Sequence, residues 1–165
     1  MNVSTLDISK FINGDDNDRS LFSEELGKSF NQTGFAIIKN NDLKKNQTDL
    51  LYDAIKTFFA LDEENKIKYY FPNLYGQRGY VVKGQEHAKG SKKGDLKEFF
   101  HIGNPSISNP QNVWPHEVNN FNEIGSQVFM TLENIGLTIL KAISMYLDID
   151  IKYFDDKVKG GDSIL

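Results

Sequence analysis

The feature that most constrains the fold is a long amphipathic segment, residues 121–147. Its apolar side chains recur at helical spacing, at Phe121, Ile124, Val128, Leu132, Ile135, Ile139, Ile143 and Leu147. This spacing predicts one helix about 40 Å long with a continuous apolar stripe. Asn120 is predicted to cap it, and Glu123 to complete a capping box. Gly125 and Gly136 each cost about 1 kcal/mol relative to alanine inside a helix, so we expect both to be positions of close packing.

Two further helices are predicted before this one. The first begins near Ser20, whose hydroxyl can cap the exposed amides, and ends at Gly34, after which residues 35–39 form a short buried strand. The second carries an apolar stripe between residues 43 and 59. Asp62 is then predicted to cap a short third helix.

Two strands are predicted in the loop-rich central third of the chain, at residues 80–83 and 96–102, where aromatic and β-branched side chains are frequent. Trp114 and Pro115 are predicted to anchor the loop that leads into the long helix. Lys97 and Glu98 form either a structural ion pair at a strand entrance or charges at the rim of a pocket. Exposed ion pairs are common, which favours the first interpretation.

Length and composition limit the class of protein. The chain has 165 residues and a formal net charge of -4, which is the size of one domain and a charge that argues against general binding of nucleic acid or anionic membranes. No stretch approaches the roughly 18 consecutive apolar residues of a membrane span, and residues 1–7 lack the features of a secretory signal. We therefore expect a cytoplasmic location. The absence of cysteine excludes disulfides, iron–sulfur clusters and thiol nucleophiles.

The three histidines do not form a recognisable metal site. A site of two histidines and one carboxylate needs three ligands that converge on one face of the ion. The residues two positions after His87, His101 and His116 are lysine, glycine and valine, so no His-x-Asp or His-x-Glu pair exists. We expect His101 to pack at a strand end, and His87 and His116 to lie in solvated loops.

A pair of motifs gives the chain its strongest signature: DLKEFFHIG at residues 95–103 and NVWP at residues 112–115. Five further motifs accompany them, namely LDISKFING at 6–14, GFAIIKN at 34–40, FFALDEENK at 58–66, RGY at 78–80 and DSIL at 162–165. Taken in their order along the chain, these motifs resemble the N-terminal region of the isopenicillin N synthase-like branch of the non-haem iron(II), 2-oxoglutarate-dependent oxygenases. The resemblance runs through nearly the whole chain.

The resemblance implies an α+β fold, in which N-terminal helices lead into the first strands of a double-stranded β-helix, or jelly-roll, whose catalytic half is absent from this chain. Residues 1–160 would form the non-haem dioxygenase N-terminal domain, and residues 161–165 the start of the truncated oxygenase domain. The parent enzyme would use iron(II), 2-oxoglutarate and oxygen to hydroxylate, desaturate or cyclise a small organic substrate. Because the iron ligands of the family lie downstream, we expect this chain alone to bind neither cofactor and to be inactive.

Within such an enzyme this region would supply pocket wall and lid, and the resemblance points to Gln77, Arg78, Tyr80 and Ser163 as substrate-binding residues. In isopenicillin N synthase an arginine at the position of Gln77 and a second tyrosine at the position of Val81 help to hold the substrate, so these replacements argue against that particular activity. Arg78 can clamp a carboxylate with its two-pronged donors or form a surface salt bridge. Ser163 either approaches the substrate or belongs to the barrel wall.

Two alternatives remain open. Residues 83–97 carry five lysines against Glu86 and Asp95, and form either a solvated linker between strands or a mobile lid that helps to admit an anionic substrate. The chain itself is either the N-terminal portion of an oxygenase or a non-catalytic module. Such a module would bind a partner, or self-associate, through the apolar face that an incomplete barrel leaves uncovered.

Overall fold

The computed structural model describes residues 2–87, 89–90, 93–107, 110–161 and 163–165, and the chain divides into two units. Unit 1 comprises Met1–Lys44 and Thr131–Gly161, and unit 2 comprises Lys45–Met130 and Asp162–Leu165. Helices predominate, and each unit contains a two-stranded sheet, so the chain mixes helix and strand as predicted. The predicted domain boundary at residue 160 stays a prediction.

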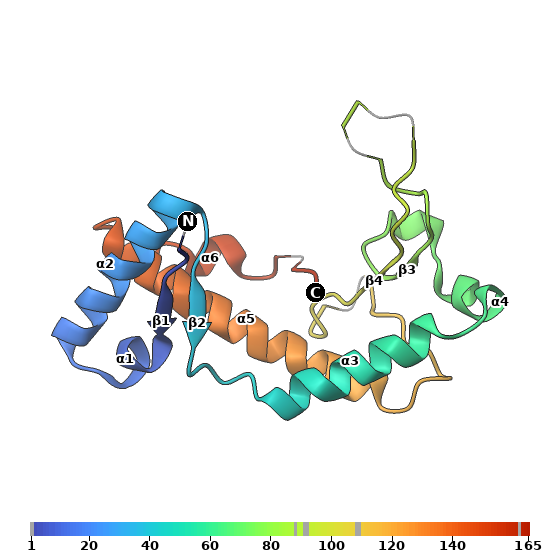
Figure 1. Ribbon diagram of the computed structural model, residues 1–165, viewed down its shortest axis with the longest axis horizontal. Coiled ribbons are helices and arrows are strands. Elements are labelled where there is room, and N and C mark those ends of the chain that lie inside the picture. The colour runs from blue at the N-terminus through green and yellow to red at the C-terminus, as the bar shows by residue number, and fades with distance from the viewer. Residues whose placement is uncertain (1, 88, 91–92, 108–109, 162) are drawn as a thin grey trace. The chain divides into compact units, whose positions relative to one another are not determined.

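Unit 1 is built on a parallel pair of short strands, β1 (Thr5–Asp7) and β2 (Ile37–Lys39), which lie side by side (Figure 1). Helices α1 (Ile8–Asn13) and α2 (Asp16–Thr33) connect the two strands, and α6 (Asp155–Val158) follows near the end of the unit. A parallel pair needs a crossover connection of a dozen or more residues, usually helical, and α1 and α2 supply it here.

The core of unit 1 gathers apolar side chains from β1, α1, α2 and the C-terminal half of α5 (Phe121–Tyr146). Its buried members are Leu6, Ile8, Phe11, Phe22, Leu26 and Ala142. Gly27 marks a close approach of α2 to α5, because a Cβ built on it would lie 2.3 Å from the ring of Tyr146. The packing of these two helices therefore depends on glycine at this position.

Two expectations for unit 1 are wrong. Helix α2 begins at Asp16 rather than near Ser20, because the Asp15 carboxylate accepts a hydrogen bond of 2.9 Å from an amide of the first turn and so takes the capping role. The strand after Gly34 is not buried, since Ile37 is 53% exposed on a sheet of only two strands. The predicted end of the helix at Gly34 is confirmed, and its φ of 77° is one that glycine adopts readily.

Unit 2 contains one long helix, several short ones and an antiparallel strand pair. In chain order these are α3 (Lys45–Phe59), α4 (Glu63–Lys66), the 3-10 helices η1 (Ile67–Tyr69) and η2 (Pro72–Leu74), β3 (Gly79–Val81) and β4 (Phe99–His101). Asp62 caps α4 by accepting a hydrogen bond of 2.9 Å from the Asn65 amide, which confirms that prediction. Both strands lie within the predicted segments, apart from Gly79, but are only three residues long.

Phe58 occupies the centre of unit 2 and is fully buried. Its ring contacts those of Phe59, Tyr69, Tyr80 and Phe100, with centroid distances from 4.8 Å to 6.0 Å. Three of the four contacts are edge-to-face with residues outside α3, an arrangement that aromatic rings favour. This cluster ties the inner face of α3 to the small sheet.

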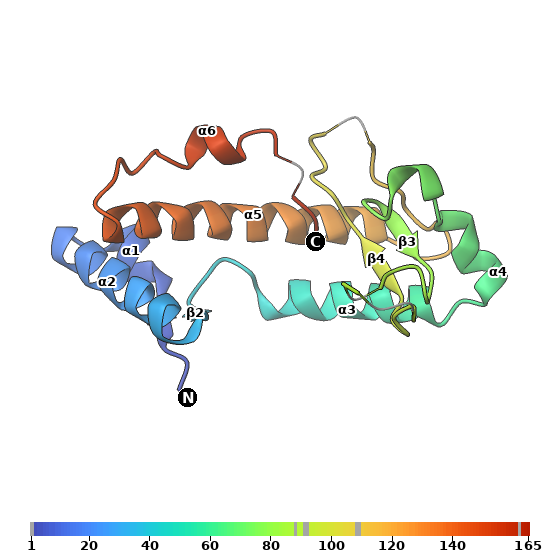
Figure 2. The same cartoon turned by 90° about the horizontal axis from the view of Figure 1, so that it is seen from above.

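Helix α5 confirms the predicted long helix and runs without interruption (Figure 2). Asn120 does not have the extended conformation that a capping box requires, since its φ is 57°. Among the residues that the structure describes, α5 is the helix whose length and composition would allow it to cross a membrane, a test that the core helix of a soluble protein also meets.

The two glycines of α5 differ in their surroundings. A Cβ at Gly125 would lie 2.9 Å from Ile102 and 3.0 Å from Trp114, so this glycine is a position of close packing as predicted. A Cβ at Gly136 meets nothing within 4 Å among the described residues, so the same prediction is wrong there.

We expect Gly136→Ala to stabilise the chain by about 1 kcal/mol, because alanine is the better helix former and the space is free. Gly125→Ala should destabilise it by about 1 kcal/mol, because crowding against Ile102 and Trp114 outweighs the same gain. Thermal unfolding followed by circular dichroism compares the two variants with the parent. Equal shifts of the two midpoints would contradict the packing described for Gly125.

Candidate functional site

The predicted substrate segment, Gln77 to Tyr80, enters β3 through a constrained turn. Tyr75, Gly76 and Gly79 all have positive φ, at 51°, 76° and 74°. At Gly79 a Cβ would also lie 2.4 Å from the backbone oxygen of Tyr69, so glycine is required there for both conformation and space. Non-glycine residues in this region of φ are uncommon, and Tyr75 adopts it at the end of η2, where its amide donates to the Pro72 carbonyl at 3.1 Å.

Hydrogen bonds fix this turn on several sides. The Gln77 amide donates to the Leu74 carbonyl at 2.9 Å, and the Gln77 carbonyl accepts from Nη1 of Arg78 at 2.7 Å. A ring nitrogen of His101, at the end of β4, bonds the Gly76 carbonyl, which confirms the expected packing of His101 at a strand end. The Gln77 side chain is exposed on this held backbone.

Arg78 is fully buried, so its interpretation as a surface salt bridge is wrong. Its guanidinium lies against Gly103, where a Cβ would come within 1.9 Å of Cζ. The DLKEFFHIG motif therefore ends on glycine because the Arg78 side chain fills the space that a Cβ at position 103 would need.

Asn112 holds Gly103 from another side and joins the two signature motifs. Its Oδ1 accepts from the Gly103 amide at 2.7 Å, and its Nδ2 donates to the Gly103 carbonyl at 2.8 Å. Trp114, two residues later, packs edge-on against Phe121 at 5.8 Å and against Gly125, which confirms its predicted role as an anchor before α5.

The C-terminal segment meets the sheet at the same point. Ile102 and Leu165 exchange two backbone hydrogen bonds, at 2.9 Å and 2.8 Å, and Gly103 forms an antiparallel bridge with Ile164. Ser163, next to this bridge, is exposed. Gly103 thus contacts Arg78 on one side and pairs with Ile164 on the other. We call it the junction, because it connects the Gln77–Arg78 segment to the residue that follows Ser163.

Tyr80 is 2% exposed and belongs to a buried network rather than to a surface. Its hydroxyl donates to Glu98 at 2.6 Å, and Lys66 Nζ lies 2.8 Å from the same carboxylate oxygen. Burial and the nearby carboxylate raise the pKa of Tyr80. Burial also pushes the pKa of Glu98 upward, but the hydrogen bonds from Lys66 and Tyr80 together outweigh it and leave that pKa below its usual value.

The expected pairing of Lys97 with Glu98 is wrong. Lys97 Nζ lies 2.9 Å from Asp95, while Glu98 points inward to Lys66 and reaches the exposed Lys83 at 3.8 Å. Neighbouring residues of an extended chain point to opposite sides, so one faces solvent and the other faces the core.

We expect Glu98→Gln to destabilise the chain by about 2 kcal/mol near neutral pH, because Lys66 then lacks its anionic partner in a mostly buried site. A lowered folded-state pKa means that ionised Glu98 stabilises the fold above its usual pKa of 4.5, and that this contribution is lost as the pH falls below it. The variant should therefore show a weaker loss of stability on acidification. Urea unfolding near neutral pH and in acid measures both effects, and the exposed Glu25→Gln serves as control.

The segment 83–97 continues the hairpin of β3 and β4 as a projecting arm (Figure 1). Gly84 donates to Asp95 and Asp95 to Glu86, each at 2.7 Å, and His87 bridges Gly94. The base of the arm is therefore a backbone ladder and not an irregular linker. Residues 88 and 91–92 lie outside the described residues, and the function of the arm as a lid stays a prediction.

His116 and Glu117 both contact the buried Tyr69, which fixes the turn before α5. The Tyr69 hydroxyl donates to Glu117 at 2.5 Å and lies 2.6 Å from Nδ1 of His116. The donated hydrogen bond lowers the pKa of Glu117. No group of three or more His, Cys, Asp or Glu side chains that could hold a metal ion occurs among the described residues.

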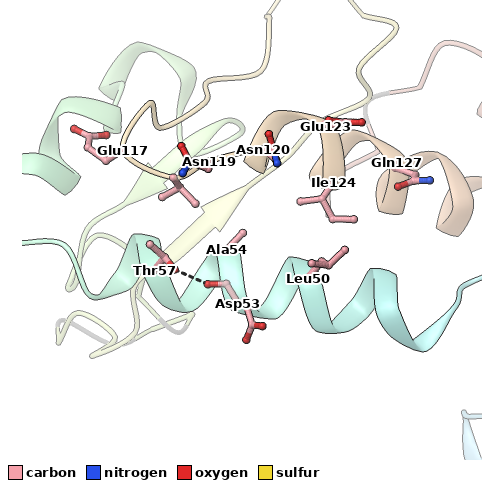
Figure 3. Close-up of a pocket in the computed structure, with 11 residues that line it drawn as sticks. Leu50, Asp53, Ala54, Thr57, Glu117, Asn119, Asn120, Glu123, Ile124 and Gln127 are labelled. Atoms are coloured by element: carbon pink, nitrogen blue, oxygen red, sulfur yellow. Dashed lines mark hydrogen bonds between the residues drawn. The ribbon is translucent and has the colours of Figure 1, made fainter.

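Two of the cavities lined by described residues lie in unit 2. The larger, about 480 Å³, runs between α3 and the start of α5, and Figure 3 shows Leu50 and Ala54 of α3 extending toward Ile124 of α5. Three carboxylates, of Asp53, Glu117 and Glu123, are among its lining residues. The second, about 410 Å³, is lined in part by Trp114, and we call it the Trp114 cavity.

Sequence reasoning missed Gly103 and Asn112, the residues that complete the junction, as well as Lys66. Gly103 and Asn112 both lie in the quoted motifs, but they are nine residues apart and no local period pairs them. Lys66 lies 32 positions from Glu98, and a lysine in a short helix gives no sign of burial.

Comparison with known proteins gives matches over most of the chain. The family described as non-haem dioxygenase in morphine synthesis, N-terminal, matches residues 3–120. The 2-oxoglutarate-dependent dioxygenase ecdK of Aspergillus rugulosus is 29% identical over 90% of this chain and 50% of its own length. The leucoanthocyanidin dioxygenase of Malus domestica is 25% identical over 99% of this chain and 46% of its own length.

Solved structures also match nearly the whole chain. A 2OG-Fe(II) oxygenase family protein from Caulobacter crescentus superposes with a TM-score of 0.82 at 34% identity, over 98% of this chain and 54% of that one. A full-length protein of Neurospora crassa, solved in complex with alpha-KG, gives 0.84 at 26% identity, over 97% of this chain and 51% of that one. The chain thus spans about half the length of the relatives it matches.

Proposed function

Since the chain belongs to the non-haem dioxygenase N-terminal family, we propose that it forms the N-terminal portion of an iron(II)- and 2-oxoglutarate-dependent oxygenase acting on a small organic substrate. In this proposal residues 161–165 begin the jelly-roll that encloses the cofactors, and the protein works in the cytoplasm. The antiparallel exchange between Ile102 and Leu165 carries the proposal, because it ties the last residues to the segment against which the Arg78 guanidinium packs.

The described residues do not by themselves fit an iron(II) site. His101 and His116 direct ring nitrogens to the Gly76 carbonyl and the Tyr69 hydroxyl, and the described part of the chain holds no cluster of potential ligands. We place the donors for iron and 2-oxoglutarate in the part of the relatives that this chain does not span. When bound there, the cofactors supply the oxidising chemistry.

This chain would supply the wall against which the substrate is oriented. Gln77 and Ser163 have exposed side chains and would meet the substrate directly. Arg78 and Tyr80 are buried and would hold the backbone of the turn and of β3 in place. Orientation of this kind lowers a reaction barrier because the entropy of alignment is already lost on binding. The basic arm, residues 83–97, would form the rim through which an anionic substrate enters.

A comparison of two polypeptides tests the proposal. The chain alone should bind no stoichiometric iron and release no succinate from 2-oxoglutarate. The protein encoded by the gene read beyond the Leu165 codon should carry a His-x-Asp motif, bind iron(II) and release succinate when a small-molecule library is added. A stop codon directly after Leu165, or turnover by the chain alone, would overturn the proposal.

The substrate wall is tested in the longer protein with a substrate found in that screen. Gln77→Ala and Ser163→Ala should each raise KM about tenfold, the value of one hydrogen bond, and leave the melting temperature unchanged because both side chains are exposed. Gln32→Ala and Ser20→Ala, exposed in unit 1, are the matched controls. An unchanged KM in both site variants would remove these residues from the wall.

The second candidate, a non-catalytic module, is favoured by one observation. Met130 and Leu132 of α5 are 38% and 36% exposed, which offers apolar surface to a partner or a second copy. Light scattering on the purified chain would then give a concentration-dependent mass. A constant monomer mass would count against self-association.

A further inference from the structure

We propose that the Trp114 cavity binds a neutral, hydroxyl-rich ligand such as a sugar or polyol. Its volume of about 410 Å³ falls within the range of small-molecule sites. The inference stands on this cavity alone and does not depend on the oxygenase chemistry.

The lining of the cavity is polar but uncharged. Three amide side chains and two hydroxyls contribute to it, from Gln111, Asn112, Asn122, Ser106 and Ser126. None of the described residues that line it is charged, although a quarter of the chain is Asp, Glu, Lys or Arg. The cavity between α3 and the start of α5, by contrast, has three carboxylates. A lining without charge offers nothing to compensate an ion that loses its water, so it favours a neutral ligand.

Amides and hydroxyls match the chemistry of a polyol. Each offers both a donor and an acceptor, and each hydroxyl of a sugar needs both. Within the part of the chain that the structure describes, the side chains of Gln111, Asn122 and Ser126 make no hydrogen bond to protein, so their donors and acceptors face a ligand or water. The Asn112 side chain uses one donor and one acceptor in its hydrogen bonds to Gly103, which leaves one donor and one acceptor for a ligand.

The walls are held in place before any ligand arrives. The ring of Trp114 is fixed between Phe121 and Gly125, where a glycine leaves room for its edge. On another side, residues 104–107 form a turn closed by the bond from the Ile107 amide to the Asn104 carbonyl at 3.1 Å, with Pro105 at the position that prolines favour. The Asn104 side chain also accepts from the Ser106 amide at 2.9 Å. An aromatic ring beside fixed polar groups is a surface against which the C–H face of a sugar can stack.

Trp114 is the only tryptophan of the chain and reports on this cavity directly. Methyl α-D-glucopyranoside, N-acetylglucosamine and myo-inositol are titrated separately into the purified chain, with tryptophan emission and amide NMR shifts as readouts. At least one should give a saturable change, with shifted amides at Gln111, Asn122 and Ser126. D-glucuronate, which adds a carboxylate to the same ring, should not bind to a chain with a net charge of -4.

Variants locate the binding. Asn122→Ala and Ser126→Ala lie on helix α5, where alanine is tolerated, and each should weaken the binding by about tenfold, the loss of one hydrogen bond. Asn119→Ala is the matched control, because Asn119 is exposed near the same helix but lines the other cavity. Linear, non-saturating responses to all three probes would overturn the proposal. So would equal binding of glucuronate, or binding that survives in the Asn122→Ala, Ser126→Ala double variant.

Discussion

Phe58→Ala should cost about 4 kcal/mol of unfolding free energy, the largest effect that we expect from a single truncation. The side chain is fully buried and touches four other rings, so its removal leaves a cavity that the short strands β3 and β4 cannot fill without losing register. Urea unfolding followed through Trp114, which belongs to the same unit, measures the change.

Phe35→Ala is the matched control for this experiment. Phe35 is 68% exposed, and its truncation should change stability by less than about 0.5 kcal/mol. A loss of similar size in both variants would mean that Phe58 is not the centre of the core. Retention of full stability by Phe58→Ala would contradict the packing of unit 2 altogether.

Gly103→Ala should cost about 3 kcal/mol, because the added methyl group occupies the position of the buried Arg78 guanidinium. The strand cannot move aside easily, since Asn112 holds Gly103 through both backbone groups and Ile164 pairs with it. The guanidinium must therefore leave its site and lose its bond to the Gln77 carbonyl. Chemical unfolding of the variant and the parent measures the difference.

A double-mutant cycle assigns this cost to Arg78. Arg78→Met keeps the apolar stem of the side chain and removes the guanidinium atoms that the new methyl group would meet. In that background Gly103→Ala should cost about 2 kcal/mol less than in the parent. Additive effects of the two substitutions would show that the cost arises elsewhere.

The sequence predicted those elements whose signal is local or strongly periodic. The long helix, the cap at Asp62 and the end of α2 at Gly34 depend on spacing or on one side chain, and each is confirmed. The anchor role of Trp114 is also confirmed. It could be predicted because a bulky ring directly before a helix has few packing positions other than against that helix.

The predictions that failed depend on what a residue meets across the fold. Nothing in their local context distinguishes Gly125 from Gly136, yet of the two only Gly125 lies against another segment of the described chain. Lys97 and Glu98 are neighbours in sequence, but the pleat sends them to different partners. The burial of Arg78 requires the glycine at position 103, a tertiary relation that no sequence period encodes.

The contact between Asn112 and Gly103 also separates the turn from the sheet. In the register of β3 and β4, Gly79 opposes His101, so a longer β3 would place Gln77 opposite Gly103. Asn112 supplies the donor and acceptor for Gly103 instead, which releases the Gln77 backbone from the ladder. The exposed Gln77 side chain can therefore be replaced without shifting the alignment of the strands, so what this turn meets can change while the sheet keeps its register.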